Sequence, residues 1–269
     1  MTSSDARPDA RDLTPERVAR SLVTRALGRS LRCLDETTST SDAVHRDALD
    51  GAPHGHVVTA ELQTAGRGRK GRRWVAPPGA NLSFSILLRP RLALEQVPSL
   101  TLCAAVGCRE ALAELGAGGV RIKWPNDLTF QGRKLAGILS EMALGKDRTA
   151  DHAVIGIGMN VNLDPLSLPP PLDETAASLQ CILGHPVDRA FLLARLLSHL
   201  EKALDAGFPA VEAAYRAGSS TLGCRVRALL EDGTVEGTAA DLTPRGALVI
   251  RKDDGSLAEV QAGDVVHLR

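Results

Sequence analysis

The chain has 269 residues, of which 43% are hydrophobic and 24% charged, and its 32 basic residues are balanced by 32 acidic ones. This composition is typical of a globular protein with one large or two modest domains, and a net charge of zero argues against general attraction to nucleic acid or membranes. No run of about 18 apolar residues could span a bilayer and the polar N-terminus lacks a signal-peptide core, so we expect a cytoplasmic protein.

The first hundred residues predict alternating helices and strands. Thr14-Pro15-Glu16 supplies an N-cap, a proline at the first helical position and an acidic first turn, for a helix that should end near residue 28. We then expect a strand at 31–34, a helix from Ser39 or Thr40 to about 49, and strands at 56–63 and 81–88. The last two strands flank a strongly basic segment.

The rest of the chain predicts one more group of strands and helices, followed by a segment of short β-like runs. The periodicity indicates a helix at 98–115, strands at 120–124, 134–144 and 153–161, a proline-rich loop at 164–172, and helices at 188–204 and 210–217. From 223 onward short β-like runs alternate with turns, which is typical of a small β-barrel. We therefore expect an N-terminal tail and short helix (1–30), a main domain (31–219) and a barrel (220–269).

The cysteines are odd in number and widely spread. They show no C-x-x-C spacing, which favours reduced, mostly buried thiols over disulfides or metal ligands, so we expect no structural metal site. The five are Cys33, Cys103, Cys108, Cys181 and Cys224.

The segment Gly66-Arg67-Gly68-Arg69-Lys70-Gly71-Arg72-Arg73-Trp74, called the basic loop below, places five cations and three glycines in nine residues without an acid. Glycines allow close approach of backbone N–H groups to a ligand, and guanidinium groups bind phosphate or carboxylate oxygens through paired donors. Because like charges repel, we expect the loop to be loose until an anion binds.

Other interpretations of this segment are weaker or depend on its surroundings. Its glycines satisfy G-x-G-x-x-G, but a dinucleotide fingerprint should open a helix, whereas WVAPPG and a strand follow here. A phosphate-binding P-loop would need Lys-Ser or Lys-Thr after its last glycine, and Arg72-Arg73 stand there instead. A solvated basic loop or a nucleic-acid patch stays open on this motif alone.

Three further motifs place polar residues within apolar strands: KWPND at 123–127, GRKLAGILSE at 132–141 and GIGMN at 156–160. Burying Lys134 among its apolar neighbours costs several kcal/mol unless an anion meets its ammonium group, and Asp127 is the obvious protein partner. A structural salt bridge explains this pair equally well, and turn chemistry explains Asn126 and Asn160.

In this order and at these distances, GRGRKGRRW, KWPND, KLAGILSE and GIGMN resemble the catalytic domain of biotin protein ligases. The resemblance runs from about residue 31 to the C-terminus. It implies an α+β fold, in which a catalytic domain related to class II aminoacyl-tRNA synthetases, with a mixed sheet and helices, precedes a small SH3-like barrel. It also implies that ATP converts biotin to biotinyl-adenylate and pyrophosphate, after which a lysine of a biotin carboxyl carrier domain is modified.

The resemblance carries roles over to matching positions of this sequence. It assigns catalytic roles to Arg69, Lys134 and Asp127, with Arg69 retaining the adenylate, and makes Arg72 and Trp74 part of a closing lid. A partly buried tryptophan at a strand start is the structural alternative for Trp74. The residues expected to bind biotin or ATP are Ser39, Thr40, Gln63, Gly66, Arg67, Gly68, Arg69, Arg72, Trp74, Asn126, Lys134, Gly137 and Asn160.

Cofactor and partner expectations follow from the same resemblance. Mg²⁺ is expected on the ATP triphosphate with no residue assigned as its ligand, and the acceptor is the carrier domain of an acyl-CoA carboxylase. Ser41 departs from the asparagine common in the family. The residues before the core are too few for an independent winged-helix domain, so no DNA binding is expected. A monomer and a homodimer are both compatible with the sequence.

Two rival functions remain to be separated. A lipoate or octanoyl ligase shares related acyl chemistry but accepts a flexible aliphatic acid, and GRGRKGRRW favours biotin over it. A nucleic-acid-binding protein would need basic and aromatic residues beyond the loop, and residues 222–269 are mixed in charge and lack aromatics.

Overall fold

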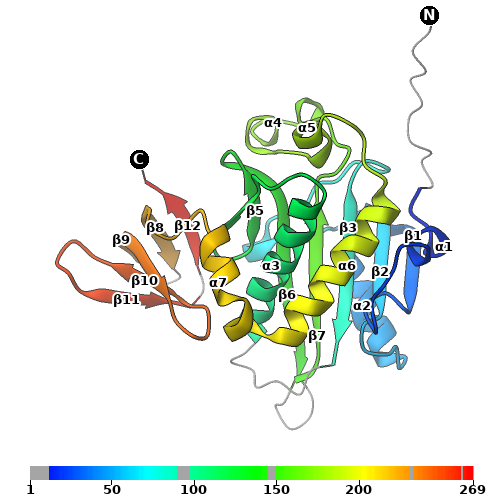
Figure 1. Cartoon of the computed structure of the whole chain (residues 1–269), viewed down its shortest axis with the longest axis horizontal. Coiled ribbons are helices and arrows are strands. Elements are labelled where there is room, and N and C mark those ends of the chain that lie inside the picture. The colour runs from blue at the N-terminus through cyan, green and yellow to red at the C-terminus, as the bar shows by residue number, and fades with distance from the viewer. Residues whose placement is uncertain (1–11, 90–96, 145–149, 231–232, 262, 269) are drawn as a thin grey trace, which may run out of the picture.

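A seven-stranded mixed sheet organises the larger part of the chain in this computed structural model, which describes residues 12–89, 97–144, 150–230, 233–261 and 263–268 (Figure 1). The strand order is β1-β2-β3-β7-β6-β5-β4, in which only β1 and β2 are parallel. The strands are β1 (Leu31–Thr37), β2 (Val57–Gln63), β3 (Leu82–Leu88), β4 (Arg121–Lys123), β5 (Asp127–Phe130), β6 (Arg133–Leu144) and β7 (Ala150–Met159).

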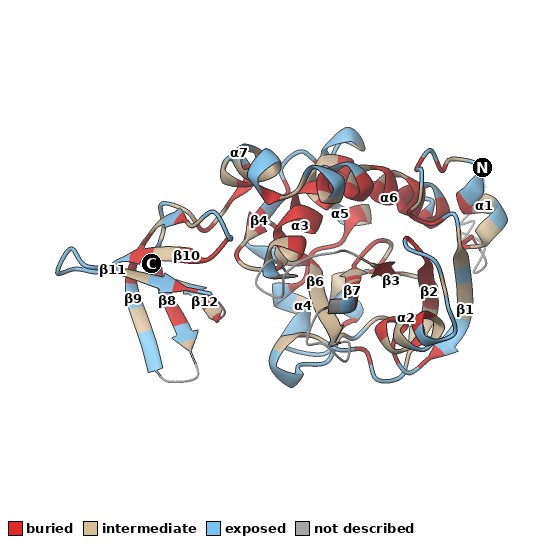
Figure 2. Ribbon diagram, turned by 90° about the horizontal axis from the view of Figure 1, so that it is seen from below, coloured by how far each residue is buried: buried red, intermediate tan, exposed pale blue. Residues whose placement is uncertain are grey.

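Helices cover both faces of this sheet, which explains why β3 is buried at every position. Figure 2 shows α2 (Thr40–Leu49) on one face and α3 (Val97–Glu114) with α6 (Arg189–Ala206) on the other. Val44 of α2 packs with Val58 and Val154 in a small cluster, whereas α3 and α6 contribute to a larger cluster that also includes residues of the C-terminal part of the chain. The two serines of β3, Ser83 and Ser85, are buried along with its apolar residues.

A second sheet follows α7 (Phe208–Gly218) and is antiparallel throughout. Its order is β11-β10-β9-β8-β12, formed by β8 (Arg225–Leu230), β9 (Gly233–Leu242), β10 (Leu248–Arg251), β11 (Leu257–Val260) and β12 (Asp264–His267). Trp124 joins the two parts, because its buried Nε1 donates to the Gly246 carbonyl at 3.1 Å. The predicted boundary at Ser219 or Ser220 lies between α7 and β8.

Most predicted elements are present, with three corrections. The first helix, α1, covers only Pro15–Ala19 instead of reaching residue 28. The sequence predicts no strand between residues 124 and 134, but β5 forms there, just before a turn at residues 131–132. Short helices also follow the proline-rich loop and its 3-10 turn η3 (Pro165–Ser167), namely α4 (Leu172–Thr175) and α5 (Leu179–Leu183).

The cysteines are all free, but fewer are buried than the sequence predicts. Cys103 and Cys108 lie in the core, where burial raises the pKa of each thiol to about 12. Cys181 is exposed. No helix among the described residues has the length and apolar character needed to cross a membrane.

Candidate active site

A cavity of about 250 Å³ opens where the end of β2, the start of α2, β6 and β7 meet beneath the basic loop. Most of the predicted binding residues line it. They are Ser39, Thr40, Gln63, Arg67, Gly68, Arg69, Arg72, Trp74, Asn126, Lys134, Gly137 and Asn160. Gly66 and Asp127 are absent from the lining, so their contribution to this site is indirect.

One end of the cavity is built from neutral polar groups at the start of α2. Ser39 is the N-cap of this helix, as the sequence predicts, and accepts a hydrogen bond from the Ser41 N–H. The Gln63 Oε1 accepts from the Thr40 N–H at 2.8 Å, and the Thr40 and Ser41 hydroxyls both lie within hydrogen-bonding distance of Ser85. Hydroxyl and amide groups held in this way can pair with an uncharged ligand that has fixed donors and acceptors.

Acids from outside the basic loop hold Arg67 in place. Its Nη1 donates to Asp42 at 2.6 Å, and its Nη2 donates to both oxygens of Glu141 at 3.1 and 3.2 Å. Partial burial lowers the pKa of Arg67, but the two carboxylates outweigh it and raise the pKa above its ordinary value. The guanidinium group is therefore charged, and the protein itself holds its orientation.

Arg69, Lys70 and Arg72 of the basic loop contact the C-terminal part of the chain. The Arg69 Nη1 donates to Asn126 Oδ1 at 3.3 Å and to the Gly263 carbonyl at 3.2 Å. Lys70, in the left-handed region with φ 53°, donates to the Leu229 carbonyl, and Arg72 donates to Asp264 at 2.8 Å. Each of these three loop cations has a protein partner, which relieves part of the charge repulsion on which the prediction of a loose loop rests.

Lys134 and Asp127 form the pair that the sequence predicts, on neighbouring strands β6 and β5. Their Nζ and Oδ1 atoms lie 2.7 Å apart without the alignment of a hydrogen bond. The prediction that the lysine is buried is wrong, because its side chain is 39% exposed while Leu135 beside it is fully buried. Alternation along β6 puts the two side chains on opposite faces, so the ammonium group reaches the cavity.

Trp74 closes one side of the cavity by packing against Gly158 of β7. A Cβ added at Gly158 would lie 2.4 Å from the indole Cε2. The indole Nε1 is buried without a hydrogen-bond partner, and Lys134 Nζ lies 6.0 Å from the ring centroid, at the outer limit of a cation–π contact. An unsatisfied buried donor facing a cavity is a group that a ligand can satisfy.

Both predicted asparagines line the cavity, but their amide groups are engaged by the protein. Asn126 donates to the Ile138 carbonyl at 2.9 Å and accepts from Arg69. Asn160 donates to the Ala177 carbonyl at 3.0 Å and accepts from Asn81 Nδ2 at 3.3 Å. These bonds favour the structural interpretation of both residues.

Several lining residues were not predicted as site residues. Gly156 and Gly158 of β7 leave room for Ser41 and Trp74, and Leu168, Leu172 and Ala176 approach from the segment of η3 and α4. The glycine alternation in GIGMN was a usable signal for the first two. Nothing in the sequence indicated the leucines, because only the tertiary structure brings residues 164–176 to β6.

Comparison with known proteins places both parts of the chain in related families. Residues 32–160 match the Biotin/lipoate A/B protein ligase family and residues 221–268 the Biotin protein ligase C terminal domain. The chain is 37% identical to the biotin--[acetyl-CoA-carboxylase] ligase of Mycobacterium tuberculosis, over 90% of each chain. It is 34% identical to the bifunctional ligase/repressor BirA of Bacillus subtilis, covering 91% of this chain and 76% of that protein.

Solved structures agree with this assignment. The fold is similar to that of the biotin protein ligase from Aquifex aeolicus in complex with biotin and ATP, with a TM-score of 0.77 and 30% identity over 90% of this chain and 99% of that one.

Proposed function

Because the chain belongs to the biotin protein ligase family and is a ligase, we propose that it activates biotin with ATP and transfers it to a lysine of a biotin carboxyl carrier domain. In the first step a biotin carboxylate oxygen attacks the α-phosphorus of ATP, forming biotinyl-adenylate and releasing pyrophosphate. In the second step the lysine amine attacks the acyl carbon, AMP leaves, and the amine loses a proton.

The observation that carries this proposal is a cavity that is neutral at one end and cationic at the other. Ser39, Thr40 and Gln63 suit the uncharged ureido ring of biotin, whereas Arg67, Arg69 and Lys134 suit its carboxylate and the phosphates. The first step brings two anions together, and fixed positive charge offsets their repulsion. Arg67 and Arg69 are already fixed by protein contacts.

Trp74 and the basic loop supply the lid in this proposal. A mixed anhydride hydrolyses in water, so a site that accumulates it must exclude solvent. The indole ring packed on Gly158 covers one side of the cavity. Its unpartnered N–H would then gain a hydrogen-bond acceptor from the bound adenylate.

Mg²⁺ enters this proposal only with the triphosphate. The residues described here contain no cluster of three or more acidic, histidine or cysteine side chains suited to a metal ion. Mg²⁺ commonly binds through substrate phosphates and retained waters. No step is therefore assigned to a protein-bound metal.

Substrate-dependent pyrophosphate release tests the first step. Purified protein with ATP and Mg²⁺ should release pyrophosphate with biotin and not with lipoate or octanoate. Lipoate or octanoate preference would move the chain to the sister ligases of the same family, and no release with any acid would contradict ligase chemistry at this site.

Transfer is tested with a carrier domain and a matched carrier in which the acceptor lysine is arginine. We expect labelling of the first protein alone. Equal labelling of both would contradict transfer to a specific lysine.

A further inference from the structure

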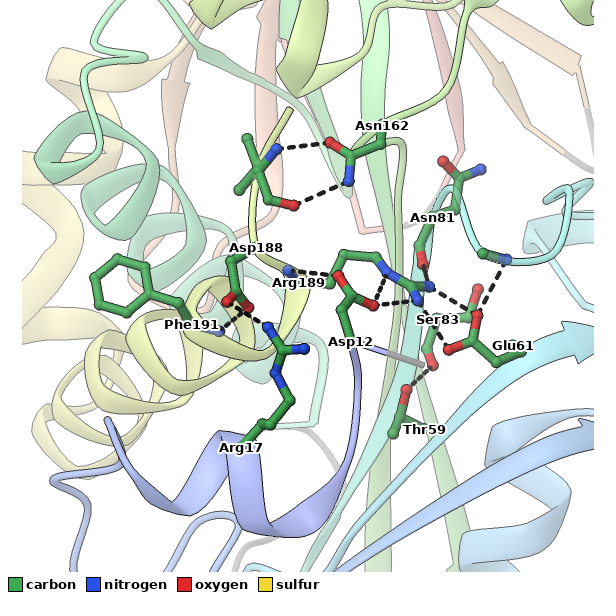
Figure 3. A network of polar contacts seen from close by, with 12 residues as sticks. Asp12, Arg17, Thr59, Glu61, Asn81, Ser83, Asn162, Asp188, Arg189 and Phe191 are labelled. Atoms are coloured by element: carbon green, nitrogen blue, oxygen red, sulfur yellow. Dashed lines mark hydrogen bonds and ion pairs between the residues drawn. The ribbon is translucent and has the colours of Figure 1, made fainter. Parts of the chain in front are cut away.

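Arg189, the first residue of α6, is buried in a network with Asp12 of the N-terminal segment, Glu61 and Asn81 (Figure 3). Its side chain is 1% exposed. Nε and Nη2 donate to Asp12 Oδ1, Nη1 donates to Glu61 and to the Asn81 carbonyl at 2.8 and 3.0 Å, and Nη2 donates to Glu61 Oε1 at 2.9 Å. These bonds use all the N–H donors that an arginine side chain has.

The three partners come from places far apart in the sequence. Asp12 precedes the first helix, Glu61 lies near the end of β2, and Asn81 immediately precedes β3. Residues 64–81, which connect β2 to β3 and carry the basic loop, are therefore held near both ends by one guanidinium group. Removing either carboxylate would leave the buried cation incompletely balanced, and breaking a buried ion pair costs about 3–5 kcal/mol.

Three further hydrogen bonds extend the network toward the β2–β3 connection and the cavity. Glu61 Oε2 accepts from the Gly79 N–H at 3.0 Å, which fixes the returning end of the β2–β3 connection. The Asn81 side chain donates to Asn160, which lines the cavity, and accepts from the Val161 N–H. Arg189 itself is not a lining residue, so it can act on the site only through Glu61 and Asn81.

We propose that Arg189 is a positioning residue for the β2–β3 connection, and that Asp12 completes the charge balance that keeps it in place. The N-terminal segment thereby contributes to the placement of the basic loop over the ligand. This inference rests on the proposed function, because it concerns how the loop retains the adenylate.

Glu201 provides a matched control on the same helix. Its carboxylate accepts the backbone N–H groups of Arg25, Ala26 and Leu27 at 2.7 to 3.0 Å, so it also fastens the N-terminal segment to α6. Its side chain is 11% exposed. Within the described residues its hydrogen bonds go to this segment and none reaches the β2–β3 connection.

The experiment compares Asp12→Asn, Arg189→Lys and Arg189→Met with Glu201→Gln in the full chain. The readouts are the dissociation rate of preformed biotinyl-adenylate and the rate of tryptic cleavage within the basic loop, with thermal stability measured in parallel. We expect Arg189→Met to accelerate dissociation and cleavage about 10-fold or more, since displacement of a positioned group by about 1 Å costs up to about 100-fold. Asp12→Asn and Arg189→Lys should give smaller increases in the same direction.

Glu201→Gln should lower stability and leave both rates near those of the wild type. Equal changes in the Glu201 and Arg189 variants, or none in either, would overturn the inference. If Arg189→Met does not fold, Asp12→Asn and Arg189→Lys decide the question by the same comparison. An inactive wild-type protein would overturn the proposed function and this inference together, whereas an active wild type with unaffected Arg189 variants would overturn the inference alone.

Discussion

Asp264 on the last strand of the C-terminal sheet accepts a hydrogen bond from Arg72 of the basic loop, 192 positions away in sequence, with Oδ1 and Nη2 2.8 Å apart. Lys70 Nζ lies 4.0 Å from the same carboxylate. The two parts of the chain thus meet at the loop that covers the cavity. A role for the C-terminal sheet in holding the ATP end of the site follows as a proposal.

Charge reversal at Asp264 tests that role. Asp264→Arg would place a third cation beside Arg72 and Lys70. An exposed or partly exposed ion pair contributes up to about 1 kcal/mol, so we expect the KM for ATP to rise about 5-fold. The KM for biotin should change less. Asp253→Arg is the control, because Asp253 pairs with Arg225 within the same sheet. Equal effects of the two reversals would argue against a specific loop contact.

Lys134→Met should suppress adenylate formation. It removes a cation that faces the cavity, and losing one preorganised electrostatic contact costs about 100- to 1,000-fold in rate. Pyrophosphate release in a single turnover measures the step, with Asp127→Asn for comparison because it breaks the same ion pair but keeps the lysine. Near wild-type release by Lys134→Met would refute the assignment.

Arg69→Gly should release biotinyl-adenylate from the site. The side chain bridges Asn126 and the Gly263 carbonyl over the cavity, and a charge-assisted hydrogen bond is worth about 1.5–3 kcal/mol. We expect adenylate formation to persist, with dissociation about 10- to 100-fold faster and labelling of lysines on bystander proteins. An unchanged dissociation rate in a rapid-mixing assay would contradict this role. Arg73→Gly serves for comparison, because Arg73 also lines the cavity but its side chain donates to the Thr64 carbonyl instead.

Gly158→Ala should displace Trp74 from its position on β7. The added methyl group would lie 2.4 Å from the indole ring, so the ring must move. Overpacking of a well-packed contact costs about 1–3 kcal/mol, which is enough to displace the ring and admit water. We therefore expect hydrolysis of the adenylate in the enzyme to rise about 10-fold. Tryptophan emission reports the movement, because Trp124 stays buried and bonded to Gly246. Emission and hydrolysis identical to wild type would show that the ring does not act as a lid.

His45 should make stability depend on pH. Burial and the neighbouring His152, with which it shares a 2.8 Å hydrogen bond, lower the pKa of His45, more than Glu141 and Asp42 raise it. As the pH falls below about 6.5, His45 is protonated in the unfolded chain before it is protonated in the folded protein. The free energy of unfolding therefore decreases from about pH 6.5 down to the lower pKa of the folded state. Thermal unfolding between about pH 7.5 and 5.5 should show a smaller loss of stability for His45→Gln. If His45→Gln lost as much stability as the wild type over this range, the prediction would be contradicted. His185 is exposed, so His185→Gln serves as the control.

The sequence predicts most strands of the main sheet because apolar alternation and flanking glycines are strong local signals. It does not predict β5, whose four residues are too few to show a period and which forms by pairing with both β4 and β6. The first helix was predicted too long for a related reason. Tertiary hydrogen bonds from Glu201 hold residues 25–27 outside any helix, and such contacts override helix propensity.

The sequence predicts most of the residues that line the cavity, but not the acids that pair with its cations. Twelve proposed binding residues line it because the family motifs carry them together. The partners of Arg67 and Arg72 were not predicted, since Asp42, Glu141 and Asp264 lie on three different elements that only folding brings to the loop. Alternation along β6 also gave Lys134 more solvent contact than its apolar neighbours suggested.

The pairing of Arg67, Arg72 and Lys134 with protein carboxylates makes ligand binding an exchange of counterions. In the proposed function, an incoming phosphate or carboxylate competes with Asp264, Glu141 or Asp127 for a cation that already has a protein partner. The number of free charges created or removed is then small, although the loop is densely basic. The affinity for the ligand will therefore depend less on ionic strength than the number of arginines in the loop suggests, because ion pairs with the ligand take the place of ion pairs within the protein.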